Sequence, residues 1–349
     1  MLMNSLLESV ISRRGLLGGA LGGLAATGLG ACASPQNGGA PVAGASAGDT
    51  SAGGGLDLAK PADNLYAFGK IWGTYADKPI YSGYQGVQFA RIGVNKLTPL
   101  FGYVGCGNMQ CRMDGNGHLW IRGTEAGYFT DLASGEIIDY WDNPYSGERV
   151  EAFPFFNYGL RGRLTQEMPR FSMGGAADDN TLMNAADARV NEDGVTPFIL
   201  PFQKVHDQYL LAWEYAHEYT NPVTPESWPK ASTGKKINPS EHFVFYIPAA
   251  ELEDRSRPSA RFHAGFMRTS PWWPWMRMGQ TEMREGALFG RMHSFKISGE
   301  LDNIPRVVLE RLERDKPELL EPQTGWEAGA NPRGTWELFS EEVPPEVQA

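Results

Sequence analysis

The chain has 349 residues, of which 42% are hydrophobic and 11% aromatic, so it can bury the core of one large domain or two smaller ones. Its formal net charge of -10 argues against binding to nucleic acid and against docking onto anionic lipid by charge alone. The 42 glycines and 24 prolines favour turns over long helices.

Residues 1–31 have the order of a twin-arginine export signal. The pair Arg13-Arg14 precedes an apolar run that ends at Ala31. At about 17 residues, this run is too short and too rich in glycine for a comfortable transmembrane helix. The LGAC run that ends at Cys32 is similar to a bacterial lipoprotein cleavage box, which makes this cysteine the candidate lipid anchor. A plain cleavable signal that is cut elsewhere is the alternative.

Residues 32–57 are small, polar and without periodicity, which predicts a flexible tether. A tether behind a lipid-modified cysteine fits a protein that the twin-arginine machinery exports and that a lipid anchor holds at the membrane. We therefore expect the protein in the periplasm or cell envelope, with residues 58–349 as a single β-rich domain.

The body of the chain reads mainly as antiparallel strands. Between residues 58 and 148, runs rich in Tyr, Val, Ile and Phe alternate with turn signals, of which DGNG at 114–117 is the strongest. No helical pattern separates these runs, which predicts a meander curled into a barrel-like, lipocalin-like sheet. Residues 160–194 read as a long loop or a short helical insertion, and residues 304–320 as a helix near the C-terminus.

Cys106 and Cys111 are the cysteines that remain besides Cys32. On a straight strand they point to opposite faces, so a disulfide between them needs a bend, which Gly107 could provide. An oxidising compartment would favour this disulfide, and the pattern leaves the pairing open. Without a histidine close in sequence, the two cysteines make a poor zinc signal.

Glu125 is the first candidate for chemistry. If residues 119–129 form a strand, Glu125 lies on an otherwise apolar face and Tyr128 lies on the other face. A carboxylate on an apolar face is costly unless it is paired or protonated, which makes Glu125 a candidate general acid or base. The alternative is a structural ion pair with an arginine.

The run VHDQYLLAWEYAHEY at 205–219 is unusually aromatic. As a strand, it places Trp213, Tyr215 and His217 on one face, which is typical of the wall of a ligand-binding cavity. As a helix, it would align Trp213 with His217 instead. The histidine is therefore either a proton-transferring group or a packed, hydrogen-bonded side chain.

The stretch PWWPWMRMG at 271–279 holds three tryptophans. Its prolines exclude a regular helix and predict an extended or turning segment. We expect Trp272 to pack in the core and Trp273 to lie beside a cavity. For Trp275 and Arg277, a role in core packing and a role in lining a pocket are equally compatible with the sequence. The arginine could contact a ligand carboxylate or balance the charge of Glu125.

Common cofactor signatures are missing from the sequence, which has no GxGxxG after a strand, no P-loop, no GxSxG elbow and no paired CxxC. We therefore expect no cofactor and no metal site. Any catalysis would be cofactor-free acid–base chemistry.

Four segments have distinctive sequences: KPIYSGYQG, LFGYVGCGN, PWWPWMRMGQ and the run DLASGEIIDYWDNPYSGE at 131–148. Together they resemble a bacterial and fungal family known as domain of unknown function 1838. The resemblance covers the chain from about Asp63 to Trp336. It implies a shared fold and brings no assigned reaction.

Three functions remain open at this point. The first is an exported, lipid-anchored protein that binds a small apolar or aromatic molecule in a cavity lined by Tyr128, Trp213, Tyr215, Trp273 and Trp275. The second is an isomerase, hydratase or lyase in which Glu125 or His217 moves a proton and Arg277 steadies negative charge. The third is a structural protein of the cell envelope that exposes an aromatic patch.

Overall fold

The computed structural model describes residues 55–93, 96–167, 184–185, 197–216, 218–297, 301–321, 324–326 and 334–347. These residues all belong to one unit of the chain, Gly53–Ala349. The predicted export signal, the candidate lipid anchor Cys32 and nearly all of the predicted tether lie outside the described residues. So do His217 and most of the predicted insertion at 160–194.

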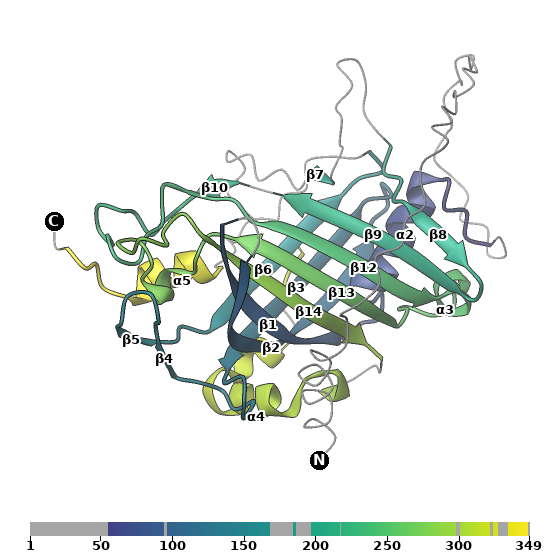
Figure 1. Ribbon diagram of the computed structural model, residues 1–349. Coiled ribbons are helices and arrows are strands. Elements are labelled where there is room, and N and C mark those ends of the chain that lie inside the picture. The colour runs from purple at the N-terminus through teal and green to yellow at the C-terminus, as the bar shows by residue number, and fades with distance from the viewer. Residues whose placement is uncertain are drawn as a thin grey trace, which may run out of the picture. The chain divides into compact units, whose positions relative to one another are not determined.

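Ten antiparallel strands form the main sheet (Figure 1). Their order across the sheet is β6 (Phe155–Leu164), β3 (Leu119–Thr130), β2 (Lys96–Met113), β1 (Ile80–Ile92), β14 (Ala287–Lys296), β13 (Phe262–Ser270), β12 (Ser240–Pro248), β9 (Gln208–Ala216) and β7 (Asn184–Ala185), and β8 (Phe202–Val205) also pairs with β9. Over the described residues, two further two-stranded sheets stand apart from this one: β4 (Tyr140–Asp142) with β5 (Arg149–Glu151), and β10 (Tyr219–Thr220) with β11 (Lys236–Ile237).

The mainly β, antiparallel character of the fold is confirmed. Most neighbouring strands follow one another in the chain, and the predicted turn at 114–117 joins β2 to β3. The pairing of β1 with β14 is the long-range exception, and it joins the N-terminal strands to the C-terminal ones. Over the described residues, the order begins at β6 and ends at β7 and the sheet is not closed, so the barrel-like form is not confirmed.

The described residues contain four α-helices: α2 (Pro61–Trp72), α3 (Ala249–Glu253), α4 (Arg306–Asp315) and α5 (Thr335–Glu342). Short 3-10 turns occur at η2 (Pro274–Met276), η3 (Leu301–Asn303) and η4 (Pro317–Leu320). Helix α4 lies within the helix predicted for 304–320. Within the described part of the chain, none of the helices has the length and apolar character needed to cross a membrane.

Helix α2 corrects the prediction that residues 58–148 hold strands alone. Pro61 stands at its first position and Asp63 in its first turn, which are both favourable at a helix start. Its buried face includes Leu65, Phe68 and Ile71, at helical spacing. This face packs against side chains from β2, β3, β9, β12 and β13.

Two buried lysines fix the ends of helices. The Nζ atom of Lys296, on β14, donates to the carbonyl oxygens of Lys70, Ile71 and Gly73 at 2.8, 2.6 and 3.0 Å, at the end of α2. The Nζ atom of Lys70 in turn donates to the carbonyls of Glu251, Leu252 and Asp254 at the end of α3. Each ammonium group thus satisfies carbonyls that a helix end leaves without partners.

The two faces of strands β2 and β3 have different partners. Val104 and Cys106 face a core that α4 and η4 cover, and Tyr128 from β3 lies in this core. Tyr103 and the alternate residues of β2 face the other way, and we call this other side the cavity face. Cys106 and Cys111 are buried and free, so the disulfide that the sequence left open does not form in this structure.

Candidate ligand-binding site

Polar side chains from both halves of the main sheet meet at one cavity. In a first row across β1, β2, β3 and β6, Ser82 lies opposite Gly107, which lies opposite Glu125, and Glu125 lies opposite Asn157. A Cβ atom on Gly107 would lie 3.3 Å from Cγ of Glu125 and 3.7 Å from Oγ of Ser82. The missing side chain at Gly107 therefore leaves space between these two polar residues.

A second row crosses β1, β14, β13 and β12. Gln88 lies opposite Gly290, which lies opposite Arg268, and Arg268 lies opposite Glu241. A Cβ atom on Gly290 would lie 3.0 Å from Oε1 of Gln88 and 3.1 Å from its Nε2. The amide of Gln88 thus lies over a strand position that carries no side chain.

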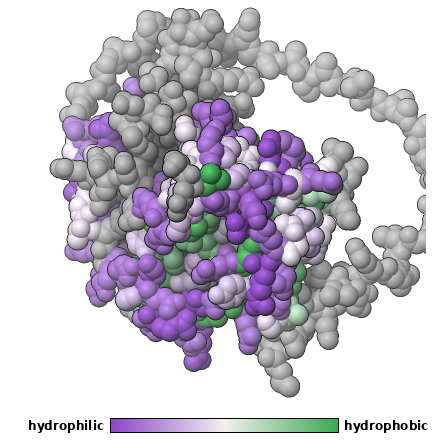
Figure 2. All heavy atoms as spheres, turned by 90° about the vertical axis from the view of Figure 1, so that its left-hand side faces the viewer, coloured by the Kyte–Doolittle hydropathy of each residue, from purple (hydrophilic) through white to green (hydrophobic). Residues whose placement is uncertain are grey.

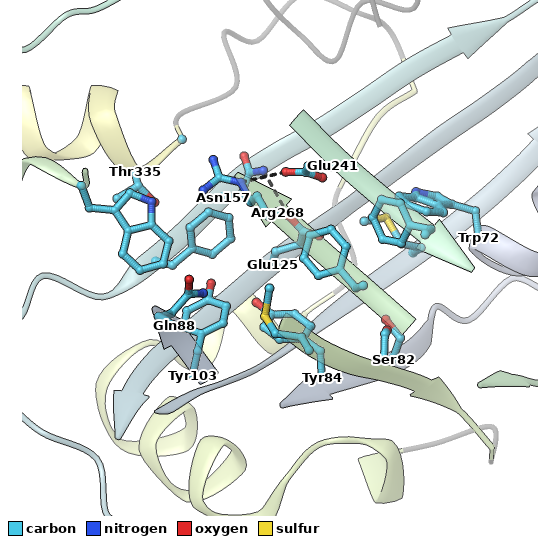
Figure 3. A pocket seen from close by; sticks show the side chains of 18 of the residues that line it. Trp72, Ser82, Tyr84, Gln88, Tyr103, Glu125, Asn157, Glu241, Arg268 and Thr335 are labelled. Carbon is cyan, nitrogen blue, oxygen red and sulfur yellow. Dashed lines mark hydrogen bonds and ion pairs between the residues drawn. The ribbon is translucent and has the colours of Figure 1, made fainter. Parts of the chain in front are cut away.

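The cavity between these rows has a volume of about 200 Å³. Of the 22 described residues that line it, eleven are aromatic: Trp72, Tyr84, Tyr103, Phe155, Tyr219, Phe243, Phe245, Phe262, Phe266, Trp273 and Trp336. In the close-up, Trp72 and Thr335 stand on opposite sides and Glu125 lies between them (Figure 3). Such a wall offers flat apolar surface with few polar groups, as small-molecule sites do.

Hydrophobic residues on the face shown in Figure 2 gather in the recessed centre, and hydrophilic residues dominate its rim. Singly exposed apolar residues are normal on a protein surface. A recessed group with a polar border is more typical of a binding site than of an aggregation-prone patch.

Glu125 is the carboxyl group with the most perturbed environment in this cavity. Burial raises its pKa to about 7, and the nearby carboxylate of Glu241 acts in the same direction. The amide Nδ2 of Asn157 donates to Oε2 of Glu125 at 3.3 Å and, with Arg268, opposes the shift. A group with this pKa exchanges its proton near neutral pH, as a general acid or base must.

Arg268 is already paired. Its Nε lies 2.9 Å from Oε1 of Glu241, and both side chains are 13% exposed. Its Nη1 donates to Oγ of Ser270 at 2.9 Å, and its guanidinium carbon lies 5.8 Å from the ring centroid of Trp336. The arginine therefore balances Glu241 rather than Glu125.

Two tyrosines on the cavity face lie flat on the sheet because glycines leave room for them. A Cβ atom on Gly105 would lie 2.4 Å from the ring of Tyr84, and one on Gly127 would lie 2.5 Å from the hydroxyl of Tyr103. The two rings stack with centroids 5.5 Å apart, and the Tyr84 hydroxyl donates to the carbonyl of Ala126 at 2.9 Å. Burial raises the pKa of both phenols, so both are neutral at physiological pH.

The tryptophan segment divides between the cavity and the core. Trp273 lines the cavity and contacts the rings of Tyr103 and Phe129 at centroid distances of 5.5 and 4.8 Å. Trp275 is 2% exposed and packs in the core beside Phe129 at 4.6 Å. Trp272 is fully buried, which agrees with the packing role expected for it.

Arg277 lies outside the cavity wall and contacts neither Glu125 nor the other polar groups of the two rows. Its Nη2 lies 3.1 Å from Oε1 of Glu346, and its Nε lies 3.7 Å from Oε2 of Glu148. Residue 277 has φ of 53°, in the left-handed region, at the point where the chain leaves η2. The structure thus gives Arg277 surface acidic partners and does not support its expected role beside Glu125.

The remaining aromatic candidates are not gathered around Glu125. Tyr128 is 2% exposed on the opposite face of β3, because three positions along a strand reverse the facing. Trp213 is on β9 and packs with Trp72 and Phe243 at centroid distances of 5.4 and 5.6 Å, behind the wall of the cavity. Tyr215 is also on β9, its side chain is outside the described part of the structure, and His217 is outside it altogether.

Sequence patterns alone did not point to four polar residues of the cavity: Gln88, Asn157, Glu241 and Arg268. The signal for two of them was present: Glu241 alternates with Phe243 and Phe245, and Arg268 with Phe266. A charged residue on an apolar strand face is the same pattern that drew attention to Glu125. Gln88 and Asn157 carry no comparable signal, because amides are common on both faces of strands.

Among the described residues, no three or more His, Cys, Asp or Glu side chains are placed to hold a metal ion together. Within the described part of the chain, the charged residues that line the cavity are Glu125, Glu241 and Arg268. This set can exchange a proton and form hydrogen bonds.

Residues 77–343 match a family model described as "Protein of unknown function (DUF1838)". No curated protein and no solved structure matches the chain. The family description assigns no residue a role.

Proposed function

This chain belongs to the DUF1838 family, and on the geometry of its cavity we propose that it binds a small, flat, apolar or aromatic molecule. The ligand would lie among the aromatic rings and direct one polar group at Glu125. The observation that carries the proposal is a cavity of about 200 Å³ whose described wall is half aromatic and contains a carboxyl group, Glu125, that forms no ion pair with the described cations. Since a purely apolar cavity of about 150 Å³ accommodates benzene, a molecule of one or two fused rings matches this space.

Thermal stability in the presence of candidate ligands tests this proposal. A panel of aromatic ketones, phenols, aromatic acids and terpenoids should contain at least one class that raises the melting temperature, because a ligand that binds only the folded state stabilises it by mass action. Quenching of tryptophan fluorescence by the same compounds would support binding beside Trp72, Trp273 and Trp336. No stabilisation and no quenching by any class would contradict the proposal.

A second candidate is a cofactor-free acid–base enzyme, which the pKa of Glu125 near 7 favours. In an unsaturated ketone, the Glu125 carboxylate would take a proton from the carbon between the carbonyl and the C=C bond and leave a dienolate. The Glu125 carboxyl would then return the proton to the far carbon of the former double bond, so the C=C bond moves into conjugation with the carbonyl and no co-reactant is needed. Arg277 has no part in this version, because its partners are Glu148 and Glu346.

Deuterium exchange separates the two candidates. Binding alone leaves the C–H bonds beside a ketone to exchange with heavy water at the uncatalysed rate. An acid–base enzyme would accelerate this exchange, and Glu125→Gln would abolish the acceleration because an amide cannot accept the proton. Equal exchange with and without the protein would leave the binding function alone.

We also propose that residues 1–31 direct export by the twin-arginine route and that Cys32 carries a lipid, with residues 32–57 as the tether. The support is the order of basic pair, apolar run and LGAC box. Arg13→Lys together with Arg14→Lys should keep the protein in the cytoplasm. Cys32→Ser should move it from the membrane fraction to the soluble periplasmic fraction, and an unchanged membrane fraction would contradict the lipid anchor.

A further inference from the structure

The charge balance of the cavity restricts which ligands it can accept. Among the described lining residues three are charged, and two of them, Glu241 and Arg268, neutralise each other at 2.9 Å. The third, Glu125, gives this described lining a net charge of zero when protonated and of -1 when ionised. In neither state do the described lining residues carry a net positive charge.

Two other sources of positive potential occur among the described residues near the cavity. The first turn of α5 contributes Gly334, Thr335 and Trp336 to the wall, and a helix N-terminus attracts anions. The side chain of Glu337 belongs to the same turn, where burial raises its pKa and the backbone groups of Gly334 and Glu337 oppose the shift, so an acidic group already lies at this helix end. The Nζ atom of Lys296 is committed to three backbone carbonyls. A ligand carboxylate would therefore lose its water without gaining a cation.

From this arrangement we infer that the cavity selects an uncharged ligand whose carbonyl or ether oxygen accepts a hydrogen bond from the Glu125 carboxyl group, and that it rejects carboxylates. This inference rests on the proposed binding function and names its ligand class. It reverses the expectation that an arginine in the pocket would hold a ligand carboxylate.

The surroundings of Glu125 support the protonated carboxyl as a donor. The amide of Asn157 donates to Oε2, which leaves the other carboxyl oxygen to carry the proton towards the cavity. The groups that influence Glu125 electrostatically are Glu241 from β12 and Arg268 from β13, the phenols of Tyr84 and Tyr103, and the thiol of Cys106. Glu241 and Arg268 act in opposite directions, so burial dominates and favours the neutral acid.

Three naphthalene probes that differ only in one substituent test the inference on the full chain: 2-acetylnaphthalene, 2-naphthoate and 2-naphthylmethylamine. Calorimetry at about pH 6 and about pH 8 should show that the ketone binds best. Its affinity should fall roughly tenfold between these two pH values, because only about a tenth of Glu125 remains protonated one unit above a pKa of about 7. The naphthoate should bind at least tenfold more weakly than the ketone at both pH values.

Glu125→Gln adds a readout that distinguishes the ligand classes. An amide N–H can replace the carboxyl O–H as donor, so the variant should bind the ketone with an affinity that no longer depends on pH. Glu282→Gln, at an exposed position, is the matched control and should keep the wild-type pH dependence. Far-UV circular dichroism of each variant checks that it is folded. The pH dependence of ketone binding by the wild type tests the inference even if a variant fails to fold.

The possible results separate this inference from the proposed function. Tightest binding of the ammonium probe, with affinity that rises with pH and is lost in Glu125→Gln, would overturn the inference and leave the binding function intact. Naphthoate binding as tight as that of the ketone, or ketone binding that does not change with pH in the wild type, would do the same. Failure of all three probes to bind would contradict the binding function itself.

Discussion

Glu241 and Arg268 face each other directly across β12 and β13 and form an ion pair at 2.9 Å. This pairing leaves Glu125, on the far half of the sheet, with the amide of Asn157 as its hydrogen-bond partner among the described side chains. The cavity therefore holds one satisfied carboxylate and one whose ionisation is opposed by burial. A buried carboxyl group whose pKa is raised in this way is typical of sites that use a proton.

The raised pKa of Glu125 has a consequence for folding stability. The ordinary value is 4.5 and the folded-state value is about 7, so the folded state holds the proton more strongly than the unfolded state between these pH values. The free energy of unfolding should therefore fall as the pH rises through this window, by up to about 3 kcal/mol from this group. In Glu125→Gln this contribution disappears. The free energy of unfolding of the variant should therefore increase relative to that of the wild type as the pH rises from about 5 to about 8.

Urea denaturation of both proteins across this pH range measures the difference. Glu282→Gln serves again as the control, since its side chain is exposed and its replacement should leave the pH dependence unchanged. A stability difference between wild type and Glu125→Gln that stays constant with pH would show that Glu125 titrates as it does in the unfolded chain.

Gly107 tests the space between Ser82 and Glu125. In Gly107→Leu, the new side chain should project from the strand position between them and weaken binding of 2-acetylnaphthalene at least tenfold, roughly the cost of losing 1.4 kcal/mol of interaction. Gly265→Leu on β13 is a matched control, because a Cβ atom there has no neighbour within 4 Å. Calorimetry compares the two variants, and equal affinities would place the ligand elsewhere.

Lys296 is expected to be a major stabilising residue despite its charge. It is fully buried, and burial lowers its pKa to about 7. Lys296→Met removes the Nζ donor from three carbonyls at the end of α2, of which those of Lys70 and Gly73 still accept from Ala260 and Ser259, so the loss falls mainly on the carbonyl of Ile71 and should lower the free energy of unfolding by about 2 kcal/mol. Lys236→Met, which removes a lysine paired with Glu218 at an exposed site, should change it by less than about 0.5 kcal/mol. Guanidinium denaturation measures the free energy of unfolding of both variants. Similar losses in the two would argue against a stabilising role for the buried Lys296 side chain.

The two body cysteines should be unreactive in the folded protein. Burial raises the pKa of Cys106 and of Cys111 to about 12, so neither forms the thiolate that attacks thiol reagents. In a Cys32→Ser variant, Ellman's reagent should label neither thiol in native buffer and both in denaturant. Rapid labelling of the native protein, or no labelling after denaturation, would contradict a pair of buried free thiols.

Local patterns in the sequence were enough to predict the strands and the hairpin at 114–117. They also place Glu125 on an apolar strand face, where the structure has it. Helix α2 was missed because its glycine and aromatic residues read as strand, although Pro61 and Asp63 mark a helix start.

The partners of Glu125 could not be read from the sequence. The cavity depends on the pairing of β1 with β14, which joins residues about two hundred positions apart, and no local pattern encodes that register. For the same reason the sequence could not tell which arginine would lie near the cavity. Arg277 is next to the conspicuous tryptophans, whereas Arg268 reaches the site because β13 lies beside β14.

Because β14 pairs with β1, the main sheet cannot be completed during synthesis until β14 has been made. Until the ribosome has released residues 287–296, the emerging chain exposes the hydrogen-bonding edge of β1 on one side and of β13 on the other. Open edges of this kind invite other chains to add on, and joining them late favours slow folding. A fragment that stops short of Ala287 is therefore expected to aggregate rather than to persist as a smaller stable domain.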